Sequence, residues 1–187
     1  MKYTTESLIN ECVLNNQEAQ KIFYDTYSKL LFGTIRRYFV NKEDAEELLT
    51  TSFLKIFKAL HSFKDIHNEQ TLKKWICRIA INESLTHKRK NKKYLNNIEI
   101  PITLEENLIT FNKDEYDNKI ISKILLDLIQ KLPEKQRQVF NLYAIDGYSQ
   151  KEICKLLTMS NSAVKSNYMR ARKFLAMKLK KKGISCY

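Results

Sequence analysis

The most informative side chains of this sequence are a cluster of basic and hydroxyl groups near its C-terminal end. They occupy about two and a half turns of one predicted helix and are Lys165, Ser166, Arg170, Arg172 and Lys173. Ammonium, guanidinium and hydroxyl groups donate hydrogen bonds to DNA phosphates and to base edges in the major groove. Asp and Glu are absent from residues 163–187, so no carboxylate there repels a polyanion. The cluster predicts a DNA-binding surface.

Two helices across a tight turn are predicted to position this cluster. The first begins at Ser149, which has the spacing of a capping box with Glu152. The second begins near Ser160 or Asn161, after a turn at residues 158–160. It carries an apolar stripe of Val164, Tyr168, Ala171 and Leu175, with the basic cluster on and beside the opposite face. The pattern is typical of a helix-turn-helix, and the capped first helix favours it over a solvated basic helix that closes a bundle.

A second line of polar side chains follows the helix predicted from Leu72 onward. Its members are spaced four residues apart and therefore share one flank: Lys74, Arg78, Asn82 and Thr86. This flank is predicted either to contact nucleic acid or to be simply solvated. Trp75, beside it, is interpreted as a core residue rather than as a platform for a base.

Charge divides the chain into three blocks. Of the net charge of +12, residues 1–93 carry 17 Lys and Arg against 11 Asp and Glu, and residues 119–187 carry 15 against 4. Residues 94–118 between them have one basic and six acidic side chains. Two basic blocks around an acidic connector predict two modules that each meet a polyanion.

Composition and periodicity favour an all-α fold of two small helical domains joined by a linker, the C-terminal one containing the helix-turn-helix. The 187 residues are 43% hydrophobic, include only three Gly and two Pro, and repeat apolar positions at helical spacing. We expect helices from Glu18 to about Phe39 and from Glu43 to about Leu60, with Asn41 and Asp44 capping the second. The predicted domains are residues 1–93 and 119–187, with an acidic linker at 94–118.

Other classes of function are disfavoured. The sequence has no Gly-rich phosphate loop, paired-carboxylate motif or activated nucleophile, so we expect no enzyme and no cofactor. Its four cysteines form no C-x-x-C pair and have no histidine at ligand spacing, so we expect reduced thiols and no metal. No apolar run reaches the length of a membrane span, and residues 1–10 lack the core of a signal peptide. A cytoplasmic protein without membrane insertion is therefore expected.

Several motifs carry a resemblance to a known family. In the C-terminal half they are Leu132-Pro133-Glu134-Lys135-Gln136-Arg137, Gly147-Tyr148-Ser149-Gln150-Lys151-Glu152-Ile153, and Ala163-Val164-Lys165-Ser166 with Arg170-Ala171-Arg172. In the N-terminal half they are Asp44-Ala45-Glu46-Glu47-Leu48 leading to Phe53-Leu54-Lys55, and Trp75-Ile76-Cys77-Arg78-Ile79-Ala80-Ile81-Asn82. The chain resembles a bacterial RNA polymerase sigma factor of the extracytoplasmic-function (ECF) type. The C-terminal motifs look like region 4 of that family, and the N-terminal motifs look like region 2.

The resemblance implies roles for individual residues. Region 2 would dock on core RNA polymerase through the helix that contains Ala45, Glu46, Leu49, Thr50 and Phe53. It would face the promoter minus-10 element through Arg78, Asn82 and Thr86, with Asn68 and Lys74 close enough to join them. Region 4 would contact the minus-35 element through Lys165, Ser166, Arg170 and Arg172, to which helix geometry adds Lys173.

By the same resemblance, the protein would bind core RNA polymerase and promoter DNA, direct initiation and assist promoter melting. An anti-sigma factor would hold it inactive. The acidic linker would thread the polymerase active-site cleft, whereas the simpler interpretation is a solvated segment kept off DNA by repulsion.

Two positions depart from the family pattern. Thr50 and Thr51 stand where a Gln and an acidic residue are common on the docking helix, and losing a charge-assisted contact costs about 1.5–3 kcal/mol. Thr158 stands in the recognition turn where Gly is frequent, and we expect little strain there. Two further hypotheses stay open: a stand-alone helix-turn-helix regulator, and a sigma mimic that titrates an anti-sigma factor.

Overall fold

The computed structural model describes the backbone of residues 3–94 and 115–184 and the side chains of residues 3–90 and 121–184. Every regular element in these ranges is a helix, which confirms the predicted all-α class. The chain divides into two compact units, Met1–Lys93 and Tyr94–Tyr187. Residues 95–114, the greater part of the predicted acidic linker, lie outside the described residues, as does Cys186.

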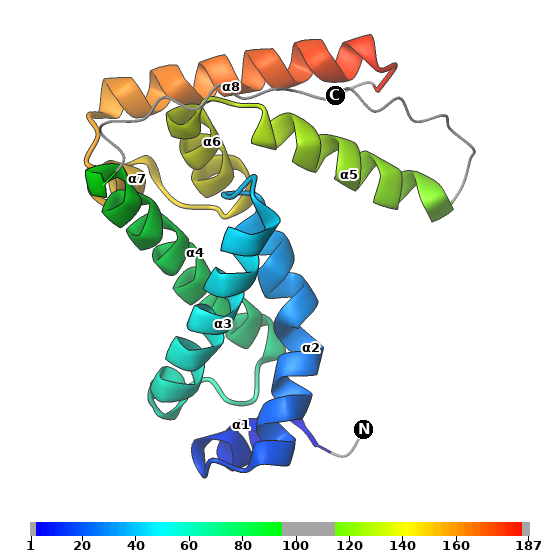
Figure 1. Ribbon diagram of the computed structural model, residues 1–187, viewed down its shortest axis with the longest axis vertical. Helices are drawn as coiled ribbons and strands as arrows, with labels where there is room; N and C mark the ends of the chain where they lie inside the picture. Colours follow the sequence, from blue (N-terminus) through cyan, green and yellow to red (C-terminus); the bar gives the residue numbers. More distant parts are fainter. Residues whose placement is uncertain (1–2, 95–114, 185–187) are drawn as a thin grey trace. The chain divides into compact units, whose positions relative to one another are not determined.

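The N-terminal unit is a small bundle (Figure 1). It consists of α1 (Thr5–Val13), α2 (Gln17–Arg36), α3 (Lys42–Ala59), the short 3-10 helix η1 (Leu60–Ser62) and α4 (Glu69–Tyr94). Helices α2 and α3 run side by side, and α1 contacts both α2 and η1. The Lys55 ammonium pairs with the Glu83 carboxylate and ties α3 to α4. The three long helices, α2, α3 and α4, supply fully buried apolar side chains to the bundle core, among them Phe23, Leu31, Ile56 and Ile76.

Helix α1 is an element that the sequence analysis missed. It begins with a capping box in which the Ser7 backbone N–H donates to the Thr4 hydroxyl at 3.2 Å and the Thr4 N–H donates to the Ser7 hydroxyl at 2.8 Å. Leu8, Ile9 and Cys12 of α1 are buried. Its nine residues are too few for the periodicity to stand out, so packing rather than pattern identifies this helix.

The next two helices lie close to their predicted positions. Asn41 is the N-cap of α3, as expected, and its side-chain oxygen accepts from the backbone N–H of Glu43 at 2.7 Å. Helix α2 ends at Arg36, three residues before the predicted end at Phe39. The Arg36 guanidinium donates to the carbonyls of Phe39 and Val40, which gives these groups partners beyond the end of the helix.

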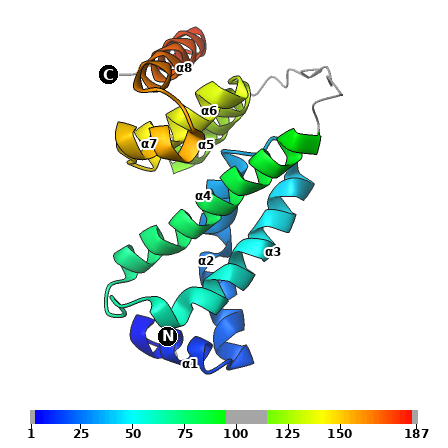
Figure 2. The ribbon, with the colours of Figure 1, turned by 90° about the vertical axis from the view of Figure 1, so that its left-hand side faces the viewer.

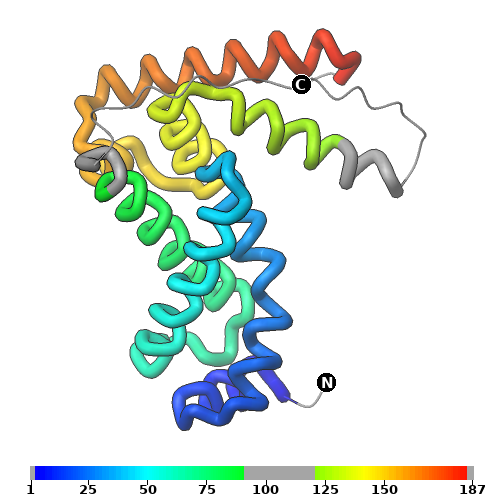
Figure 3. The backbone as a smooth tube through the Cα atoms, in the orientation of Figure 1, coloured from blue at the N-terminus to red at the C-terminus, as the bar shows by residue number. Residues whose placement is uncertain are grey.

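The C-terminal unit consists of α5 (Glu115–Gln130), α6 (Glu134–Phe140), the π-helix η2 (Asn141–Ile145), α7 (Gln150–Leu157) and α8 (Asn161–Lys181). Figure 2 shows α6 and α7 against the first part of α8. The later part of α8 runs along α5 (Figure 3), where Leu128 and Leu132 pack with Leu175 and Leu179. Helix α8 is therefore held along its length by one apolar stripe, and its other faces are left to solvent.

Candidate nucleic-acid interface

The start of α7 has the predicted capping box. The Ser149 hydroxyl accepts from the Glu152 backbone N–H at 3.3 Å, and the Glu152 carboxylate accepts from the Ser149 N–H at 2.9 Å. Two otherwise exposed donors are thereby satisfied. Ile153 of α7 is fully buried and anchors the short helix in the unit. The predicted first helix of the helix-turn-helix is confirmed.

The turn between α7 and α8 is tight and contains a left-handed residue. Thr158 ends α7 with φ 52° and ψ 51°, and the Met159 N–H donates to the Cys154 carbonyl at 3.0 Å. Ser160 is the N-cap of α8 and accepts from the Ala163 N–H at 3.2 Å. A β-branched residue at positive φ is a conformational outlier, so the Thr158 side chain opposes this turn more than a Gly would.

Helix α8 buries the predicted stripe. Val164, Ala171 and Leu175 are buried. Tyr168 is half-buried, with its ring 4.7 Å from the ring of Tyr143 and 6.3 Å from that of Phe140, centroid to centroid. These contacts fix the rotation of α8 about its own axis. They consequently decide which side chains face solvent.

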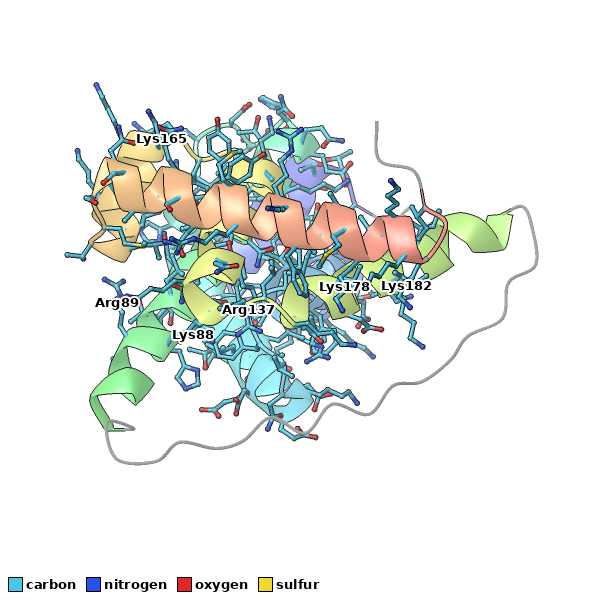
Figure 4. All side chains as sticks on the ribbon, turned by 90° about the horizontal axis from the view of Figure 1, so that it is seen from above. Lys88, Arg89, Arg137, Lys165, Lys178 and Lys182 are labelled. Atoms are coloured by element: carbon cyan, nitrogen blue, oxygen red, sulfur yellow. The ribbon has the colours of Figure 1, made fainter. Side chains whose placement is uncertain are left out.

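All five residues of the predicted minus-35 set are exposed on α8. In the described part of the chain, none of these five side chains forms an ion pair or a hydrogen bond. Figure 4 shows Lys165 near the start of α8 and Lys178 and Lys182 near its end. A shallow hollow of about 410 Å³ lies on the same helix and is lined by Met169, Arg170, Arg172, Lys173 and Ala176. The structure thus presents cationic donors that have no intramolecular use.

The predicted minus-10 set lies along α4 and at its N-terminus. Lys74, Arg78 and Asn82 are exposed, whereas Thr86 is half-buried. The Thr86 hydroxyl accepts from the Arg89 guanidinium at 3.3 Å. Asn68 precedes α4, and its side-chain oxygen accepts from the backbone N–H groups of Gln70 at 3.0 Å and Thr71 at 3.1 Å. Asn68 is therefore an N-cap, with only its amide NH₂ left for another partner.

The predicted polymerase-binding set on α3 divides into two groups. Ala45, Leu49 and Phe53 are buried, and Phe53 packs its ring 4.5 Å from that of Tyr24, centroid to centroid. These three residues form the core beneath the surface because they share the apolar stripe of α3. The two exposed members are Glu46 and Thr50.

The exposed side of α3 has a mixed character. Glu46 pairs with Lys42 at 3.3 Å, and the Thr50 hydroxyl donates to the Glu46 carbonyl at 3.2 Å. Thr51 makes the equivalent bond to the Glu47 carbonyl at 3.1 Å. Leu54, one turn after Thr50, is 58% exposed. Sequence reasoning quoted Leu54 in a motif but gave it no role, although its position off the apolar stripe was a usable signal.

Arg137 of the C-terminal motif has a structural position. It is buried, and its Nη1 donates to the Gln130 carbonyl at 2.8 Å across the α5–α6 turn. Burial lowers the pKa of its guanidinium, while Glu134 nearby acts in the opposite direction. Elsewhere, burial raises the pKa of the Cys12 thiol to about 11 and that of Tyr27 to about 12. All three groups lie in the cores and not on the exposed faces of α4 or α8.

Neither metal sites nor membrane spans are found in the part of the chain that the structure describes. Among these described residues, Cys12, Cys77 and Cys154 form no disulfide. No three His, Cys, Asp or Glu side chains among residues 3–90 and 121–184 lie together as a metal site would require. Within the described ranges, no helix combines the length and apolarity needed to cross a bilayer.

Comparison with known proteins relates both units to one family. Residues 23–94 match the family model described as Sigma-70 region 2, and residues 122–175 match Sigma-70, region 4. Curated relatives include the ECF RNA polymerase sigma-E factor of Haemophilus influenzae, 23% identical, with 94% of this chain and 95% of the relative covered. The RNA polymerase sigma factor SigV of Bacillus subtilis is 24% identical with 98% of each chain covered. SigW, an ECF sigma factor of the same organism, is 27% identical with 96% of this chain and 99% of the relative covered.

A solved structure has a similar fold. It is the sigma factor RpoE of Bartonella quintana in complex with the anti-sigma factor NepR, with a TM-score of 0.54 and 21% sequence identity. The likeness covers 86% of this chain and 96% of that one. The two matched family regions together span about two thirds of the present sequence.

Proposed function

Because this chain belongs to the sigma-70 family as an ECF sigma factor, we propose that it directs core RNA polymerase to promoters with α8 on the minus-35 element and α4 on the minus-10 element. Sigma factors are transcription initiation factors rather than enzymes. The single observation that carries the proposal is the exposed basic face of α8, whose five side chains have no other role in the described structure.

The chemistry of α8 suits the major groove of duplex DNA. A helix with its side chains has a diameter of about 10–12 Å, and the major groove is about 12 Å wide. Arg170 and Arg172 supply planar guanidinium groups, which bind phosphates or guanine edges through two parallel hydrogen bonds. Lys165 and Lys173 supply point charges for the phosphates that set the register. The rigid apolar stripe beneath holds these groups in a fixed arrangement.

The role proposed for α4 is to hold an unpaired promoter strand. Opening one base from the stack costs a few kcal/mol, which contacts to that base and to its strand offset. Lys74 and Arg78 would neutralise backbone phosphates, and the Asn82 amide would bond to a base edge. The Asn68 NH₂ would join them while its carbonyl oxygen caps the helix. Such melting needs binding energy but no nucleotide hydrolysis.

Docking on core polymerase is proposed for the exposed side of α3. Of the five docking residues that the family resemblance implies, Glu46 and Thr50 are exposed. Leu54 adds apolar area beside them. A rim of polar groups around an apolar contact is the usual anatomy of a protein–protein interface. An anti-sigma factor is proposed as a second partner by analogy with the Bartonella complex, in which RpoE is bound to the anti-sigma factor NepR.

The proposal is tested by reconstituting the chain with core RNA polymerase of its host. The holoenzyme is expected to retain a discrete set of genomic promoter fragments and to start transcripts at fixed positions on them. Arg170→Ala should reduce retention, whereas Lys181→Ala, at an exposed lysine in the last turn of α8, serves as the matched control. Retention of random fragments with no fixed start would contradict the proposal.

Melting is tested separately by the reactivity of unpaired thymines toward permanganate on the retained fragments. The wild-type holoenzyme is expected to expose thymines just upstream of the start. Asn82→Ala should lower this reactivity without lowering the fraction of polymerase bound to the chain. Unchanged reactivity in both Asn82→Ala and Arg78→Ala would remove α4 from the melting step.

A further inference from the structure

Met169 is an apolar side chain at the centre of the basic face of α8. It is 59% exposed, so the fold makes little use of it. On a helix, the residues three and four positions away are the nearest surface neighbours. For Met169 these neighbours are Lys165, Ser166, Arg172 and Lys173. Met169 is thus surrounded by the predicted minus-35 contacts although no comparison or motif assigns it a role.

The chemistry of Met169 restricts what it meets in a DNA complex. Its thioether donates no hydrogen bond, so it supplies neither a phosphate contact nor a polar base contact. The major-groove edges of the bases present one apolar group, the C5-methyl of thymine. Met169 itself lines the shallow hollow on α8, together with Arg170, Arg172, Lys173 and Ala176, and this hollow has space for a small apolar group.

We infer that Met169 is a specificity-determining residue that packs against a thymine methyl group in the upstream promoter element. The inference rests on the proposed function, because it needs α8 in the major groove. If Lys165, Ser166, Arg172 and Lys173 all touch DNA, the side chain between them is enclosed by the duplex. A polar base edge packed against the Met169 side chain would be buried without a hydrogen-bond partner. Thymine is therefore favoured over cytosine at the base pair that Met169 contacts.

Met177 provides a matched control on the same helix. It is 49% exposed and lies eight residues further on, beyond the predicted contacts. Replacing either methionine with Ala slightly favours the helix and removes only a partly exposed side chain from outside the core. Both variants are therefore expected to fold, which circular dichroism and thermal unfolding of the full chain will show.

The experiment uses the reconstituted holoenzyme and has two stages. First, the upstream element is selected from a duplex library randomised in that region. Second, each thymine of the selected element is replaced in turn by uracil, which pairs identically but lacks the methyl group. Equilibrium binding of wild type, Met169→Ala and Met177→Ala is then measured on every duplex at one salt concentration.

One thymine is expected at which uracil weakens wild-type binding roughly fourfold, the effect of one buried methyl group. Met169→Ala should abolish this difference, and Met177→Ala should retain it. The inference is overturned if Met169→Ala discriminates thymine from uracil as wild type does, or if no thymine in the element is sensitive to uracil. Failure to select any upstream element overturns the proposed function itself and the inference with it.

Discussion

The two candidate DNA faces differ in how far the fold itself uses their side chains. On α8, the five predicted contacts are exposed and make no side-chain bond in the described structure. At α4, Asn68 caps the helix and Thr86 accepts a hydrogen bond from Arg89. Binding and stability are thus separable on α8 and coupled at α4. Mutations should therefore give pure binding effects on the first face and mixed effects on the second.

The largest expected effect is on α8. Arg170→Ala should weaken binding of the holoenzyme to its upstream element roughly tenfold to a hundredfold, because a charge-assisted contact is lost. If the contact is to a phosphate, the slope of log affinity against log salt concentration should become shallower by about one unit. Thermal unfolding of the chain should not change. A lower melting temperature would show that Arg170 also contributes to the stability of the C-terminal unit.

A smaller, mixed effect is expected at Asn68. Asn68→Ala removes the N-cap of α4 and should lower the free energy of unfolding of the N-terminal unit by about 1 kcal/mol. Asn68→Ser keeps a capping oxygen but lacks the amide, so it should retain most of this stability. Urea unfolding measures both.

The same pair of variants separates the two roles of Asn68. If its NH₂ contacts the promoter, Asn68→Ser should reduce melting, measured by permanganate reactivity, although the domain is stable. If the holoenzyme with Asn68→Ser melts the promoter as fully as wild type does, Asn68 acts only as the N-cap of α4.

In the recognition turn, Thr158→Gly should raise the free energy of unfolding of the C-terminal unit by about 0.5–1 kcal/mol. Gly adopts φ 52° without the steric cost of a β-branched side chain, although it gains more entropy in the unfolded chain. Guanidinium unfolding followed by circular dichroism measures the change. A destabilised variant would indicate that the Thr158 side chain contributes contacts which outweigh the backbone cost.

An effect of similar size is expected in α2. Gly33 lies inside this helix, and a Cβ added there would meet no atom within 4 Å. Gly33→Ala should therefore stabilise the N-terminal unit by about 0.5–1 kcal/mol through helix propensity alone. Binding of DNA by α8 should be unchanged, and loss of polymerase binding would reveal that the bare backbone at Gly33 touches a partner.

Much of the fold could be predicted because the relevant signals are local. The caps at Ser149, Ser160 and Asn41 need only a side-chain oxygen two or three residues before a free N–H. The stripe on α8 follows from spacing, and exposure of its basic residues follows from the stripe. These predictions concern one helix at a time and hold whatever packs against it.

What could not be predicted depends on packing between elements. Ala45, Leu49 and Phe53 were assigned to polymerase docking through the helix they share, but burial separates them from Glu46 and Thr50. The family motif identifies a helix and not one of its faces. Thr158 was noted as standing where Gly is frequent, with little strain expected. Its left-handed conformation instead places a β-branched side chain at positive φ, which carries a conformational cost. The roles of the individual site residues remain predictions.

The proposed sigma factor role is best tested by the affinity of the purified chain for core RNA polymerase of its host, measured by fluorescence titration at a stated salt concentration. For a sigma factor we expect nanomolar binding, about −12 kcal/mol, despite Thr50 and Thr51 on the docking helix. Absent or only micromolar, salt-sensitive binding would contradict that role. The duplex-DNA affinity of the same chain would then decide between a stand-alone helix-turn-helix regulator and a sigma mimic.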